Sequence, residues 1–128
     1  MSKIKTRILC VLLGSVLTLA VLWVVAWQEA RTQMTTALNA AELMNYQAAT
    51  TNFFAIVGRW PTSARELFSN STGLAFINTS HPGHDAWGRE IIYEPYSTNV
   101  GYGKVASYGR NGILGGMGAD ADIEFRFP

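Results

Sequence analysis

A run of twenty uncharged residues near the start of the chain restricts its fold more than any other feature. Residues 8–27 read ILCVLLGSVLTLAVLWVVAW. Twenty helical residues span about 30 Å, which matches the hydrocarbon core of a bilayer. Because backbone groups in lipid must hydrogen-bond internally, an inserted run of this kind is helical. We therefore expect a transmembrane anchor over residues 8–27.

Charges beside this run predict its orientation. The basic side chains that precede it, with no acidic one, are Lys3, Lys5 and Arg7. Positive charge tends to stay in the cytoplasm, so we expect residues 1–7 there and residues 28–128 across the membrane. The alternative is a cleaved signal peptide with residues 24–26 as its cleavage site, although the apolar regions of signal peptides are shorter.

The rest of the chain suits one small domain with a slightly negative charge. Of 128 residues, 48% are apolar, and residues 28–128 hold seven basic and nine acidic side chains. This balance argues against a nucleic-acid partner, which requires a basic face. The single cysteine, Cys10, excludes an intrachain disulfide. We interpret Cys10 as a thiol among lipid tails rather than a lipidation site.

Apolar periodicity predicts that the membrane helix continues outward. Residues 28–57 contain neither Pro nor Gly, and one set of side chains recurs at helical spacing. This set, the outer stripe, comprises Met34, Leu38, Ala41, Met44, Ala48, Thr51, Phe54 and Ala55. The more polar sides carry Asn39, Glu42, Asn45 and Gln47. We expect one helix over residues 8–57, ended by Gly58 as a left-handed cap.

Short elements are predicted beyond the helix. Ser63 and Glu66 have the spacing of a capping box, which predicts a short helix. Residues 69–88 are rich in turn formers and predict a loop, and five glycines predict another over residues 109–118. Strand patterns occur at residues 89–94, 102–108 and 123–127. The expected fold is α+β, with a long helix whose outer half packs on a small antiparallel sheet.

Three phrases resemble a known family. Residues 58–62 read GRWPT, residues 85–89 read DAWGR and residues 107–123 read SYGRNGILGGMGADADI. In this order they resemble the major (G-type) pseudopilin of bacterial type II secretion systems, within the type IV pilin-like superfamily. The resemblance implies a pilin-like fold, and residues 28–128 as a periplasmic pseudopilin domain on an inner-membrane anchor.

The same resemblance implies a structural role and no enzymatic activity. Subunits of that family assemble into a helical fibre that supports protein export across the outer membrane. The implied partners are other pseudopilin subunits, inner-membrane secretion components and membrane lipid. We expect subunits here to pack through the outer stripe.

The N-terminal region differs from that family. Its members carry a basic leader that ends in Gly, followed by an apolar run with Glu at the fifth position. Here Gly14 is preceded by apolar residues and followed by Ser15, and the fifth residue after it is Leu19. The alternative function is therefore a membrane-anchored calcium-binding or accessory module that shares the fold without polymerising.

In the pseudopilin family the glycine-rich loop folds around one calcium ion. Carried over to this sequence, the resemblance implies side-chain ligands from Asn111, Asp120 and Asp122, and backbone carbonyl ligands from Tyr108 and Ile113. Such an oxygen-rich set suits calcium, a hard cation. The alternative is that Asp120 and Asp122 only cap a turn and stay solvated.

Other chemical motifs have simpler interpretations. His81, His84 and Asp85 invite a zinc site, but we interpret them as a solvated turn because zinc needs further ligands. Trp60 and Trp87 are expected to pack the sheet onto the helix, with contact to an exported protein as the alternative. No nucleophile–base arrangement is suggested by spacing, so no enzyme is expected.

Overall fold

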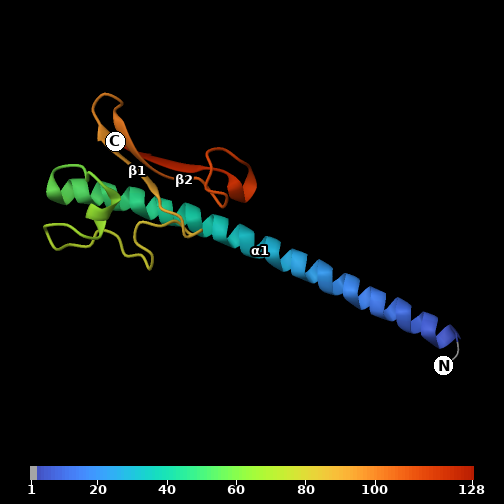
Figure 1. The fold of residues 1–128 in the computed structure, drawn as a ribbon. Helices are drawn as coiled ribbons and strands as arrows, with labels where there is room; N and C mark the ends of the chain where they lie inside the picture. Colours follow the sequence, from blue (N-terminus) through green and yellow to red (C-terminus); the bar gives the residue numbers. More distant parts are fainter. Residues whose placement is uncertain (1–2) are drawn as a thin grey trace. The chain divides into compact units, whose positions relative to one another are not determined.

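The computed structural model describes residues 3–128 and has an α+β layout (Figure 1). Helix α1 (Lys3–Val57) is followed by the 3₁₀ helix η1 (Ala64–Leu67) and strands β1 (Ile92–Ser97) and β2 (Tyr102–Ser107). The 3₁₀ helix η2 (Gly118–Asp120) then precedes strand β3 (Ile123–Phe127). The strands form one antiparallel sheet in the order β1-β2-β3, packed on α1.

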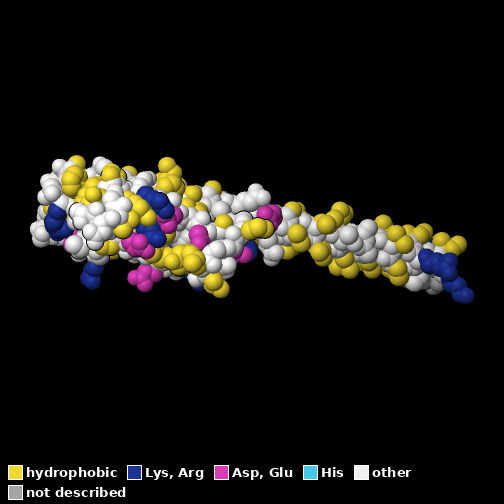
Figure 2. Space-filling model, turned by 90° about the horizontal axis from the view of Figure 1, so that it is seen from above, with side chains coloured by type: hydrophobic (Ala, Val, Ile, Leu, Met, Phe, Trp, Pro, Cys, Tyr) yellow, Lys and Arg dark blue, Asp and Glu magenta, His cyan; other side chains and the backbone are white. Residues whose placement is uncertain are grey.

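The chain forms two compact units, Met1–Met34 and Thr35–Pro128. The first unit is the apolar part of α1. An 18-residue window has a mean hydropathy of 2.8, and none of it is buried within the protein. Figure 2 shows hydrophobic side chains covering this part of the helix, with basic side chains at its N-terminal end. By length and composition, this helix is compatible with a membrane span.

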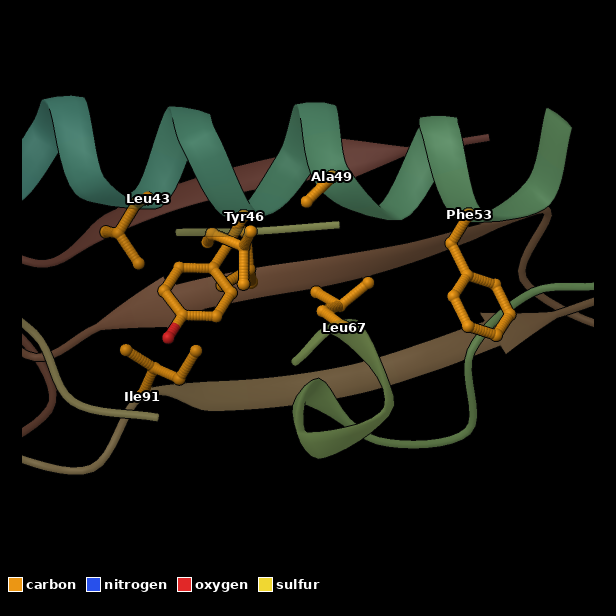
Figure 3. Close-up of a cluster of buried hydrophobic side chains, with 8 residues drawn as sticks. Leu43, Tyr46, Ala49, Phe53, Leu67 and Ile91 are labelled. Carbon is orange, nitrogen blue, oxygen red and sulfur yellow. The ribbon is translucent and has the colours of Figure 1, made fainter. Parts of the chain in front are cut away.

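The core of the second unit lies between α1 and the sheet. Leu43, Tyr46, Ala49 and Phe53 are buried on one face of the helix and pack with Leu67 of η1 (Figure 3). Further buried members of this core are Ile77, Ile91 and Val105. Spacings of three and four residues place the helix side chains on one face.

This core face is different from the outer stripe. Every residue of the outer stripe is exposed, from Met34 to Ala55. Asn39, which the helical pattern assigns to a polar side, is fully buried instead. That assignment was wrong because helical periodicity identifies an apolar side but does not reveal polar partners elsewhere in the fold.

Two strand predictions are confirmed within one residue, and one is displaced. β2 and β3 agree with the sequence pattern, whereas β1 begins three residues later than predicted. Residues 89–91 pair with the preceding loop, because the Asp85 N–H donates to Arg89 and the Ile91 N–H donates to Gly83. Pro95 is accommodated because β1 is an edge strand.

The end of α1 agrees with prediction, but the capping box does not form. Gly58 has φ 79° and its N–H donates to the Phe54 carbonyl at 2.9 Å. Ser63 makes no side-chain capping bond. The Glu66 carboxylate accepts instead from Arg59 Nη1 at 2.8 Å and from Thr62 at 2.9 Å.

Candidate functional site

A buried polar network joins α1 to the loop that carries the second phrase. Asn39 Nδ2 donates to Ser107 Oγ at 3.0 Å, and the Ala86 N–H donates to Asn39 Oδ1 at 3.1 Å. Both ends of the Asn39 amide are therefore satisfied without water. Because buried polar groups are costly without partners, this side chain fixes the position of the loop on the helix.

Asp85 organises the turn that follows. Its Oδ1 accepts from the backbone N–H groups of Trp87 at 3.0 Å and Arg89 at 2.9 Å, while its Oδ2 accepts from Ser107 Oγ at 2.5 Å. Asp85 is only 4% exposed. The carboxylate thus holds the turn closed and attaches it to the end of β2.

The network ends at the start of the glycine-rich loop. The Gly109 N–H donates to Ser107 Oγ at 3.2 Å, so Ser107 links the loop to Asn39 and Asp85. Gly109 has φ 66°, and a Cβ there would lie 2.7 Å from the carbonyl carbon of Asp120. Only glycine fits this close approach between the two ends of the loop.

An ion pair closes the glycine-rich loop. Arg110 Nε donates to Asp120 Oδ1 at 2.9 Å and Arg110 Nη2 donates to Asp120 Oδ2 at 3.1 Å. The Arg110 N–H also donates to the Ala119 carbonyl at 2.8 Å. A bidentate ion pair of this kind is stronger and more directional than a single hydrogen bond.

The other implied calcium ligands lie in the same loop. Asn111 Oδ1 accepts from the Ile113 N–H at 3.0 Å, and Asp122 Oδ2 accepts from the Gly115 N–H at 2.8 Å. Ile113 is exposed and Tyr108 is half-buried. Asp122 Oδ1 is buried and has no hydrogen-bond partner within residues 3–128. This oxygen fits a bound cation, whereas both oxygens of Asp120 already have a partner.

His81 and His84 lie in an exposed turn. His81 Nδ1 is 3.0 Å from Ser80 Oγ, and His84 Nδ1 is 3.1 Å from the Pro82 carbonyl. Within residues 3–128, no three His, Cys, Asp or Glu side chains are grouped as a metal site. That finding does not bear on calcium, since the implied ligands include an amide and backbone carbonyls.

Trp60 connects the end of α1 to the sheet, as expected. Its ring stacks on Phe54 with centroids 4.2 Å apart, and on Tyr96 of β1 at 5.5 Å. It also lies 5.5 Å from the ring of Phe127 in β3. Trp87 is half-buried in the turn, and its Nε1 is buried without a partner within residues 3–128.

Comparison with known protein families and with characterised proteins finds no match to this chain.

The sequence did not reveal two of these features. Asn39 and Ser107 are separated by 68 positions, so no local pattern relates them. Arg110 stands beside the implied ligand Asn111, and its charge was the available signal for the pair with Asp120. The short phrases in the sequence identified the other site residues. They did not predict which hydrogen-bond partners these residues have.

Proposed function

We propose that this protein is a structural, pseudopilin-like subunit of a type II secretion fibre, with a pilin-like fold and no enzymatic activity. The exposed outer stripe is the observation that carries this proposal. Further support comes from the α+β layout, the apolar N-terminal helix and the three phrases that resemble the G-type pseudopilin. The partners are further copies of pseudopilin subunits, inner-membrane secretion components and lipid.

The outer stripe leaves large apolar side chains in water. Leu38 is 52% exposed, Met44 is 54% exposed, and Phe54, which stacks on Trp60, is still 40% exposed. All three lie on the part of α1 that packs against the sheet. Exposed apolar side chains of this size on a helix are typical of association sites. Copies of the chain that pack through the outer stripe would bury this surface.

The test is crosslinking of the full chain in its membrane. Leu38→Glu should abolish association between copies, because a charge in an apolar interface stays unpaired. The fold should persist, since Leu38 does not contribute to the core. Asn99→Glu is the matched control, because it adds the same charge in the exposed β1–β2 turn. Crosslinks that persist in Leu38→Glu at the level of the control would refute this interface.

The location we propose is the bacterial inner membrane. Residues 8–27 would span it, residues 1–7 would lie in the cytoplasm and residues 28–128 in the periplasm. The basic side chains before the apolar run support this orientation.

The proposal includes one calcium ion in the glycine-rich loop. Side chains of Asn111, Asp120 and Asp122 and the carbonyls of Tyr108 and Ile113 would hold it, and the ion would cross-link the loop. The unpaired Asp122 oxygen supports this assignment. Calcium at about 100 times its dissociation constant would stabilise the fold by roughly 2.7 kcal/mol. Thermal unfolding with calcium and then with chelator measures this effect, and no shift would refute the ion.

A second candidate is an accessory module that does not polymerise. Leu19 favours it, because the pseudopilin family has Glu at the corresponding position to set the register of subunits. In that case the wild-type chain would give no crosslinks between copies, and Leu38→Glu would change nothing.

A further inference from the structure

The glycine-rich loop already contains a cation, the guanidinium group of Arg110. It binds both oxygens of Asp120, one of the three side chains implied for calcium, at 2.9 and 3.1 Å. A metal ion that bound Asp120 would need the same oxygens. The Arg110 guanidinium and a metal ion would therefore compete for Asp120, because both are cations that bind the same carboxylate and repel one another.

The charges around the loop also balance without a metal. Arg89 Nε and Nη2 donate to the Arg110 carbonyl at 3.1 and 2.7 Å, which holds a second guanidinium against this loop. The loop region thus holds two guanidinium groups, one of them paired with Asp120, beside the carboxylates of Asp120 and Asp122. The affinity of an oxygen site for calcium rises with the number of charged ligands, and nearby positive charge opposes it.

One carboxylate oxygen is left for an incoming cation. Asp122 Oδ1 is buried and has no partner within residues 3–128, while Asp122 Oδ2 accepts from the Gly115 N–H. A cation could contact Asp122 first, but the positive charge of Arg110 would oppose its ligation by Asp120. The loop therefore has two alternative ways to close around Asp120.

We propose that Arg110 competes with calcium for Asp120, so that the loop is closed by the guanidinium at low calcium and by the metal at high calcium. This inference rests on the calcium site proposed above. It predicts that the wild-type loop keeps its closed form without metal and binds calcium weakly.

The experiment is a calcium titration of thermal unfolding on the full chain in detergent micelles. Arg110→Gln removes the competing charge, so the calcium concentration for a half-maximal shift should fall at least ~10-fold. Without calcium, the same variant should unfold at a lower temperature than wild type. Arg65→Gln is the matched control, because it removes one positive charge from an exposed position in η1.

A second variant tests whether the effect of Arg110→Gln acts through Asp120. In Arg110→Gln/Asp120→Asn the contested carboxylate is gone, so the gain in calcium affinity should disappear. A gain that remains in this double variant would overturn the role of Asp120.

Two further outcomes separate this inference from the calcium site itself. Equal calcium midpoints in wild type, Arg110→Gln and Arg65→Gln would overturn the competition and leave the calcium site standing. If calcium shifts the unfolding temperature of neither wild type nor Arg110→Gln, the site and the competition both fail. The fibre proposal stays independent, because crosslinking tests it.

Discussion

At the scale of single residues, Asn39 connects α1 to two distant parts of the domain. It lies fully buried, accepts from Ala86 and donates to Ser107, which in turn contacts Asp85 and Gly109. One helix residue thereby positions both the turn after residue 85 and the first residue of the glycine-rich loop. Loss of its amide leaves buried partners unsatisfied, which costs more than the bond contributes.

We therefore expect Asn39→Leu to lower the free energy of unfolding by roughly 1–3 kcal/mol. Chemical unfolding of the full chain in detergent measures this change. Asn45→Leu makes the same substitution at an exposed position of α1 and should change stability by no more than about 0.5 kcal/mol. Equal effects of the two variants would show that the Asn39 network is not important for stability.

Glu66 gives a prediction about pH. The Arg59 guanidinium beside it, followed by the Thr62 hydroxyl, holds the pKa of the Glu66 carboxyl below its ordinary value. A lowered folded-state pKa stabilises the fold above the ordinary pKa, and this stabilisation is lost as the pH falls through the lowered value. The free energy of unfolding should therefore decline as the pH falls below the ordinary glutamate pKa of about 4.3.

Glu66→Gln should reduce the decline in the free energy of unfolding at low pH by about 0.5 kcal/mol. The amount is small because Arg59 is half exposed. Unfolding measured across this pH range tests the prediction. Arg59→Gln should reduce the decline to a similar extent, since it removes the other partner. A decline identical to wild type in both variants would contradict this role for the pair.

At the scale of elements, the centre of the sheet depends on a glycine with an ordinary backbone conformation. A Cβ on Gly103 in β2 would lie 2.3 Å from Cε2 of Phe127 and 2.8 Å from the Glu94 carbonyl oxygen. Gly103 thus lets the Phe127 ring of β3 cross the adjacent strand and reach Trp60 and Tyr93. The sheet and the end of α1 share this aromatic contact.

Gly103→Ala should destabilise the fold by roughly 1–3 kcal/mol, because the added methyl forces Phe127 or the strand to move. Thermal unfolding of the full chain is the measurement. Gly14→Ala is the control, since nothing lies within 4 Å of its added Cβ, and it should have little effect. A neutral Gly103→Ala would mean that β2 and β3 separate easily.

The same elements show which parts of the fold are predictable from sequence. β3 follows strict alternation and Gly58 ends α1 where the pattern predicts, because both signals are local. β1 begins later than its sequence pattern predicts, because the Ile91 N–H donates to the Gly83 carbonyl in the preceding loop. The alternation of apolar and polar residues does not indicate a hydrogen bond of this kind. The Arg110–Asp120 pair depends on loop geometry set by glycines, so the sequence indicated the ligand types without their partners.

At the scale of the whole molecule, the two ends of α1 are in different chemical environments. The first unit exposes apolar side chains almost throughout, and the second buries one face of the helix under the sheet. Exposed Val, Leu and Trp side chains on the first unit are unfavourable in water and favourable in lipid. In the proposed orientation, the basic residues before them face the cytoplasm.

The proposed location in a bacterial inner membrane predicts the labelling of cysteines in cells whose outer membrane alone has been made permeable. Cys10 of the wild type should resist a maleimide that does not cross the inner membrane, because in this location its thiol would lie in lipid. With Cys10→Ser as background, Asn52→Cys on the exposed side of α1 should label readily. Thr6→Cys should label only after the inner membrane is opened. Labelling of Thr6→Cys while the inner membrane is closed would show that the orientation is the opposite of the one proposed. Labelling of Cys10 would show that the apolar helix does not span the membrane.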